Sequence, residues 1–204
     1  MIVTPVSSNT VAEKCETFRE VIRTKIGSPY VIAAMQAALQ AHPPGTVVAG
    51  YEANGGFLLG SDVQMPENCL KALPTRDAIL PILSLLTTAA KRGVALSELP
   101  KELPRRFTAS DRIQNVATES SRSLITSMRD GTIDPVQILA PGAGPVIEQD
   151  VTDGLRLIFK SGEIVHLRPS GNAPELRCYS EANSQERAMQ LSSEALQRIS
   201  ALIL

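Results

Sequence analysis

The order of strand and helix signals differs between the two halves of this 204-residue chain. In the first half, strand-like and helical segments alternate. We expect strands at residues 2–6, 20–26 and 46–49, and a helix from Ser28 to about Gln40. A serine followed by a proline is typical of a helix start, with the serine as the cap and the proline in the first helical position. Alternation of this kind predicts an α/β/α domain with a mixed, mostly parallel sheet.

A second long helix is predicted later in the same half. It runs from Thr75, as its cap, to about Arg92, and Ile79 and Leu83 belong to its apolar face. Pro81 is compatible with this helix only in the first turn or at a kink, because a proline inside a helix removes a hydrogen bond and crowds the preceding turn.

Strands dominate the second half. Residues 155–160, 163–167 and 176–180 read as strands, and an amphipathic helix follows from about Ser184. Runs of strands beside helices predict a smaller α+β domain with helices on an antiparallel sheet.

A segment rich in proline and basic side chains, residues 99–106, separates the two halves. Such composition is typical of a linker. We therefore expect two domains, at residues 1–104 and 105–204.

Composition excludes several classes of function. The formal net charge is −1 and aromatic residues make up 3% of the chain, so neither a general attraction to nucleic acid nor a base-stacking platform is indicated. The three cysteines are widely spaced and read as reduced thiols. The longest apolar run, residues 78–86, contains a proline and is too short to span a bilayer. We therefore expect a cytoplasmic protein with no nucleic-acid partner and no membrane association.

The segment from Arg168 to Arg177 has the composition of a phosphate site. Each arginine offers a planar fork of donors that suits phosphate oxygens. Ser170 and Asn172 add a hydroxyl and an amide, and Gly171 allows backbone N–H groups to approach an anion. The alternative is a surface turn with two solvated arginines.

The glycine-rich segment 50–56 is a candidate sugar site. Glu52 and Asn54 lie two residues apart after a strand, and a carboxylate with an amide suits neighbouring sugar hydroxyls. Lys25, just before Gly27 and a helix start, is a further candidate for an anionic ligand. A turn with an exposed glutamate and a solvated lysine are the alternatives.

Together these three segments resemble the α-D-phosphohexomutases, the family that includes phosphomannomutase and phosphoglucomutase. The run from Arg168 is similar to the family's phosphate-binding loop, Arg-Pro-Ser-Gly-Thr-Glu-Pro followed shortly by arginine. The run Gly50-Tyr-Glu-Ala-Asn-Gly resembles the sugar-specificity loop, Gly-Glu-x-Ser-Gly. The segment around Lys25 resembles the one that supplies a phosphosugar-contacting lysine. The segments occur in the family's order, and the resemblance covers essentially the whole chain.

Three positions depart from the family's pattern. Asn54 stands where the family usually has serine, Asn172 replaces threonine and Ala173 replaces glutamate. These departures leave the preference for mannose or glucose open.

The resemblance implies that the chain corresponds to the third and fourth of four domains. The family's first domain carries a Ser-His-Asn-Pro loop whose serine is phosphorylated, and the second carries an Asp-Gly-Asp-Gly-Asp-Arg loop that holds Mg²⁺. Neither string occurs here. The implied roles are sugar binding by Lys25, Glu52 and Asn54, and phosphate binding by the loop that begins at Arg168. Catalytic residues and metal ligands are expected outside this chain.

The implied reaction interconverts hexose 6-phosphate and hexose 1-phosphate through a phosphoserine and a bisphosphate intermediate. The implied partners are a phosphorylated hexose and the missing N-terminal domains, and the chain alone is expected to be inactive. Two alternatives remain open: a standalone phosphosugar-binding or regulatory module, and an interaction domain without a ligand.

Overall fold

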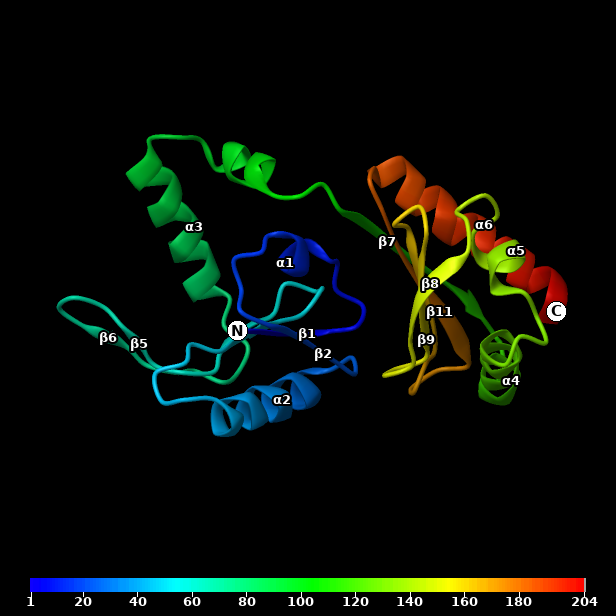
Figure 1. Cartoon of the computed structure of the whole chain (residues 1–204), viewed down its shortest axis with the longest axis horizontal. Coiled ribbons are helices and arrows are strands. Elements are labelled where there is room, and N and C mark those ends of the chain that lie inside the picture. The colour runs from blue at the N-terminus through cyan, green and yellow to red at the C-terminus, as the bar shows by residue number, and fades with distance from the viewer. Residues whose placement is uncertain (204) are drawn as a thin grey trace. The chain divides into compact units, whose positions relative to one another are not determined.

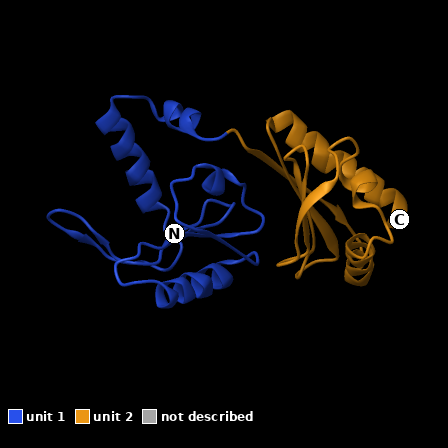
Figure 2. Ribbon diagram, in the orientation of Figure 1, with its two compact units in different colours: residues 1–104 blue, residues 105–204 orange. Residues whose placement is uncertain are grey.

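The computed structural model describes residues 1–203 and divides into two compact units, residues 1–104 and residues from Arg105 onward (Figure 2). Each unit has its own sheet and its own buried core. Within residues 1–203 no single helix is long and apolar enough to cross a bilayer. The helices Ile79–Arg92 and Leu96–Glu102 meet that criterion only when taken together, across a 92° bend.

The first unit is built on a four-stranded sheet with the order β2-β1-β3-β4 (Figure 1). Strand β1 runs parallel to both of its neighbours, and β4 pairs antiparallel with β3, so the prediction of a mixed, mostly parallel sheet is confirmed. The elements of the unit are β1 (Ile2–Pro5), α1 (Val11–Lys14), β2 (Val21–Thr24), α2 (Ser28–Ala41), β3 (Ala49–Tyr51), β4 (Phe57–Leu59), β5 (Val63–Gln64), β6 (Cys69–Leu70), α3 (Ile79–Arg92) and the 3₁₀ helix η1 (Leu96–Glu102).

Helix α2 covers one face of this sheet. Its Val31 and Met35 are buried against Val3 and Leu58 of the strands. At Gly50 in β3, a Cβ atom would lie 2.6 Å from Cγ1 of Val31, so the absence of a side chain there lets the helix approach the strand closely.

The predicted cap of α2 and the predicted bounds of the third strand are both wrong. Gly27, rather than Ser28, is the residue at the N-cap of α2, and the Ser28 hydroxyl donates a hydrogen bond to Glu52 instead of capping the helix. The third strand begins at Ala49, where the prediction ended it, because pairing with β1 draws Gly50 and Tyr51 into the ladder.

The N-cap of helix α3 is Ala78, three residues after the predicted cap at Thr75. Asp77, rather than Thr75, meets its free N–H groups: Oδ1 accepts from the backbone N–H of Ile79 at 2.8 Å and of Leu80 at 3.2 Å. Pro81 therefore falls in the first turn, where it displaces no helical hydrogen bond.

The second unit is built on a five-stranded antiparallel sheet with the order β7-β11-β10-β9-β8 (Figure 1). Helices lie against this sheet, so the prediction of an α+β arrangement is confirmed. The elements are β7 (Phe107–Gln114), α4 (Thr118–Arg129), α5 (Pro135–Leu139), β8 (Val146–Asp150), β9 (Leu155–Phe159), β10 (Ile164–Pro169), β11 (Glu175–Ala182) and α6 (Gln185–Ile203).

The two faces of this sheet differ. One face is apolar: residues such as Leu157, Leu167 and Leu176 pack against Leu191 and Ile199 of α6. Because side chains alternate along a strand, their sequence neighbours project from the other face. That face is polar.

Arginines stand side by side on the polar face. Arg168 in β10 is the register partner of Arg177 in β11, and Arg177 is the partner of Arg112 in β7. Register partners in adjacent strands point to the same side of a sheet. The sheet therefore carries a row of three guanidinium groups across three strands.

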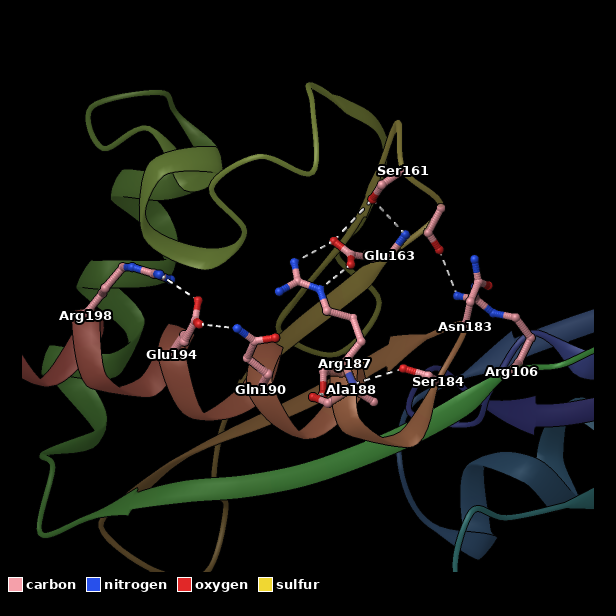
Figure 3. A network of polar contacts seen from close by, with 12 residues as sticks. Arg106, Ser161, Glu163, Asn183, Ser184, Arg187, Ala188, Gln190, Glu194 and Arg198 are labelled. Carbon is pink, nitrogen blue, oxygen red and sulfur yellow. Dashed lines mark hydrogen bonds and ion pairs between the residues drawn. The ribbon is translucent and has the colours of Figure 1, made fainter.

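A network of ion pairs fastens α6 to the sheet (Figure 3). Arg187 of α6 donates to Glu163, the residue before β10, through Nε (2.5 Å) and Nη2 (3.1 Å), and Ser161 donates to the same carboxylate at 3.3 Å. These contacts hold the pKa of Glu163 below its usual range, mainly through Arg187. Arg106, just before β7, donates to Glu181, to Asn183 and to the carbonyl of Gly162 at the same end of the sheet. The sheet is thus a fixed platform for the residues on its polar face.

Candidate functional site

The predicted site residues fall into two groups, one in each unit. Lys25, Glu52 and Asn54 belong to the first unit. The second unit holds the phosphate-loop residues Arg168, Ser170, Gly171, Asn172 and Arg177.

Glu52, just after β3, has a buried carboxylate with one oxygen, Oε2, held by two side chains. Its side chain is 4% exposed. Oε2 accepts hydrogen bonds from the Ser28 hydroxyl at 2.7 Å and from Arg76 Nε at 2.8 Å, and Arg76 Nη2 lies 2.7 Å away. The alternative of an exposed glutamate in a glycine-rich turn is therefore wrong. The carboxylate is held in one orientation by two donors from distant parts of the sequence.

The loop after Glu52 is a tight turn that closes on itself. The backbone N–H of Glu52 donates to Gly56 O at 2.8 Å, and that of Gly55 donates back to Glu52 O at 2.9 Å. Asn54 Oδ1 accepts from the Gly56 N–H at 3.1 Å, so its oxygen stabilises the turn. A Cβ atom at Gly56 would lie 3.1 Å from Glu52 Oε2 and 3.2 Å from Arg76 Nε, so a glycine leaves room for the ion pair.

Lys25 lies just beyond the end of β2, in the segment that leads to Ser28. Its ammonium group is 5.9 Å from the ring centre of Tyr30, a cation–π contact, and the side chain is exposed. The parallel strands β2 and β3 end at the same edge of the sheet, which brings the segment of Lys25 beside Glu52 through the Ser28 bond. Ligands of open α/β sheets bind at this kind of edge.

Arg76, which also contacts Glu52, is not among the site residues predicted from the sequence. Its segment is fixed to β4 by a hydrogen bond from the Asp77 N–H to Phe57 O at 2.8 Å. In the sequence, Arg76 is a lone arginine in a short stretch between a strand and a helix. Nothing in that pattern indicates that its partner is Glu52, 24 residues earlier.

Arg168, at the end of β10, is paired with Asp153. Nε lies 2.9 Å from Asp153 Oδ2, an ion pair whose geometry falls short of a hydrogen bond. Asp153 belongs to the turn that precedes β9, and its carbonyl oxygen is 2.6 Å from Nε2 of the buried His166. Burial lowers the pKa of His166 to about 4, so the ring is neutral at pH 7 and Nε2 donates to this carbonyl. Asp153 is not among the site residues predicted from the sequence.

The loop after Arg168 is compact. The Ser170 N–H donates to Glu175 O at 2.9 Å, the Glu175 N–H to Ala173 O at 2.8 Å, and the Asn172 N–H to Ser170 Oγ at 3.4 Å. Arg168, Ser170 and Gly171 line one cavity of about 450 Å³. Its other wall comes from α4 and from the turn that contains Asp153.

Arg177 lines a different cavity, of about 490 Å³, together with Ser110, Arg112 and Tyr179. Its Nη2 is 2.6 Å from Oε1 of the buried Glu175, and Arg112 Nη1 is 3.4 Å from Oε2 of the same carboxylate. Arg177 lowers the pKa of Glu175 by hydrogen bonding to it. The structure thus brings Arg168, Ser170 and Gly171 together and places Arg177 in the neighbouring cavity.

In the part of the chain that the structure describes, no group of three or more His, Cys, Asp or Glu side chains is arranged to hold a metal ion. No described residue is therefore assigned to Mg²⁺.

Comparison with family models gives two matches that together cover most of the chain. Residues 1–107 match the model described as phosphoglucomutase/phosphomannomutase, alpha/beta/alpha domain III. Residues 94–197 match the C-terminal domain of the same family.

Comparison with curated proteins and solved structures agrees. The chain is 48% identical to a phosphomannomutase of Salmonella muenchen and 41% identical to one of Sinorhizobium fredii, over 97% and 96% of its own length. It spans 40% of the length of each of these relatives. Its fold is similar to a phosphoglucomutase/phosphomannomutase family protein from Burkholderia thailandensis, with a TM-score of 0.64 at 18% identity. That likeness covers 98% of this chain and 37% of the other.

Proposed function

Because the chain belongs to the phosphoglucomutase/phosphomannomutase family, we propose that it is the sugar- and phosphate-binding half of a phosphomannomutase-like enzyme. Residues 1–104 are the third domain, with the sugar-specificity loop, and residues 105–204 the C-terminal domain, with the phosphate-binding loop. The 48% and 41% identities to phosphomannomutases support mannose phosphate as the substrate.

The whole enzyme interconverts hexose 6-phosphate and hexose 1-phosphate through a phosphoserine and a bisphosphate intermediate. The serine and the ligands of Mg²⁺ lie outside this chain, on the missing N-terminal domains, and the whole enzyme is cytoplasmic. The role of this half is to hold the sugar and its non-reacting phosphate in line for transfer, which is how phosphoryl-transfer enzymes gain most of their rate.

The cavity at Arg168 is the observation that carries this proposal. Arg168, Ser170 and Gly171 gather there a guanidinium, a hydroxyl and an open backbone. These groups suit a phosphate monoester. Asn172 extends the loop, and Arg177, held by Glu175, supports it from the neighbouring strand.

Glu52, Asn54 and Lys25 bind the sugar end of the ligand. Ser28 and Arg76 both bond Oε2 of Glu52, so Oε1 is the oxygen that accepts a sugar hydroxyl. A carboxylate held in this way loses little conformational freedom when the sugar binds.

The test is a titration of the purified chain with mannose 1-phosphate, followed by ³¹P NMR, which detects weak binding. We expect the wild-type chain to bind and Arg168→Ala to bind about tenfold more weakly or worse, because a charge-assisted pair is lost. Arg129→Ala, an exposed arginine on α4, is the matched control. Equal binding by wild type and Arg168→Ala contradicts the phosphate assignment, and mutase turnover by the chain alone contradicts the placement of the serine elsewhere.

A further inference from the structure

Helix α4 presents a polar stripe to the cavity at Arg168. Thr118, Arg122 and Thr126 follow one another at intervals of four residues, and all three line that cavity. Residues four apart lie on the same side of a helix. The stripe is therefore a continuous wall of two hydroxyl groups with a guanidinium between them.

The position of this wall is fixed relative to the phosphate loop. The backbone N–H of Val116, just before α4, donates to Pro174 O at the end of the loop, at 3.0 Å. The opposite side of the helix is buried in the core through Leu124 and Met128. The main chain that carries Arg122 is therefore held in place, while its exposed side chain can turn toward a ligand.

The charge balance of the cavity makes Arg122 significant. The charged side chains that line the cavity are Arg122, Asp153 and Arg168, and the last two are paired at 2.9 Å. Their charges offset each other, so the net positive charge comes from Arg122. Within residues 1–203 the side chain of Arg122 makes no ion pair or hydrogen bond. A phosphate monoester carries roughly −1.5 to −2 charges at pH 7, which one neutralised arginine does not balance.

We infer that Arg122 is a further phosphate-binding residue, which contacts the phosphate from the α4 side of the cavity while Arg168, Ser170 and Gly171 contact it from the loop. This inference rests on the proposed function and extends it. It assigns the net attraction for a dianion to a residue outside the loop motif, and it gives Asp153 the task of orienting Arg168.

The experiment uses inorganic phosphate as the probe, titrated into the chain at constant ionic strength and followed by ³¹P NMR. We expect Arg122→Ala to weaken binding about tenfold or more, the loss that accompanies removal of one charge-assisted pair. Arg122→Lys keeps the positive charge but loses the planar pair of donors. Its affinity for phosphate should lie between that of the wild type and that of Arg122→Ala. Arg129→Ala, on the same helix but outside the cavity lining, should bind as the wild type does.

Arg168→Ala separates this inference from the proposed function. Loss of binding in Arg168→Ala together with wild-type binding in Arg122→Ala overturns the role of Arg122 and leaves the loop assignment intact. Wild-type binding in Arg168→Ala overturns the loop assignment itself. A circular dichroism spectrum and an unfolding midpoint, both unchanged in Arg122→Ala, show that a loss of binding is local.

Discussion

Gly154 lies so close to β10 that a Cβ atom on it would be 2.1 Å from the carbonyl oxygen of Leu167. Its φ of +92° is also one that residues with side chains rarely adopt. This approach brings the preceding residue, Asp153, within 2.9 Å of Arg168. A backbone contact in the turn thus determines how the guanidinium of the phosphate loop is held.

Gly154→Ala should destabilise the chain by about 2–4 kcal/mol, because it adds a clash with the main chain to the strain of a positive φ. Gly162→Ala is the matched control: its φ is +81°, but nothing lies within 4 Å of the added Cβ. It should cost about 1–2 kcal/mol, the strain alone. Denaturant unfolding measures both free energies. Equal losses in the two variants would show that the turn can move away from β10.

Arg76→Ala should destabilise the first unit by about 1–2 kcal/mol, because it leaves the buried Glu52 carboxylate with Ser28 as its remaining side-chain donor. Arg92→Ala removes an arginine from an exposed pair with Glu102, and should cost about 0.5 kcal/mol or less. The two variants are compared by urea unfolding of the same chain. A loss in Arg76→Ala no larger than in Arg92→Ala would mean that Glu52 does not depend on this partner.

Much of the fold could be predicted from the sequence because its elements alternate cleanly. Strands β9 and β10 carry apolar residues at every second position, so their period was visible. Strand β7 was missed because it is an edge strand: Ile113 packs against the core, but most of its side chains are exposed, and it exists through its pairing with β11. Short elements such as α5 contain too few residues for the spacing of their apolar side chains to indicate a helix.

The candidate site divides in the same way. The residues of the loop motifs could be named, since Arg168, Ser170 and Glu52 lie in recognisable local patterns. Their partners could not be named, because Asp153 and Arg76 are brought to them by strand pairing and by the path of the chain between strand and helix. The single hydroxyl of Ser28 illustrates the limit: a local rule made it a helix cap, and tertiary contact turned it to a carboxylate.

The stability of the chain should fall as the pH is lowered from about 6.5 to about 4, because of His166. The folded state holds the pKa of His166 at about 4, below the unfolded value of 6.5, so the unfolded state binds a proton first as the pH falls. The stabilisation is fully present above pH 6.5 and is lost toward pH 4. It amounts to about 3 kcal/mol over this range. Unfolding free energies measured between pH 7 and pH 4 give the slope.

His166→Gln should flatten this slope, because glutamine keeps a donor for the Asp153 carbonyl and does not titrate. His42→Gln, which changes the only other histidine of the chain, should leave the contribution of His166 to the pH dependence of stability unchanged. An unchanged slope in His166→Gln would assign the acid sensitivity to other groups.

Cys178 should resist alkylation in the folded chain, whereas the partly exposed Cys15 and Cys69 should react. All three thiols are free of disulfides, but Cys178 is fully buried in the core between the sheet and α6, and burial raises its pKa to about 12. The reactive thiolate is therefore nearly absent at pH 8, and reagent reaches the sulfur only when the unit opens. Iodoacetamide labelling followed by mass spectrometry should show Cys178 modified about a thousandfold more slowly than the other two, a difference that guanidinium removes. Labelling of Cys178 at the rate of Cys15 without denaturant would mean that the sheet and α6 separate readily, and the platform beneath Arg168 would then be mobile.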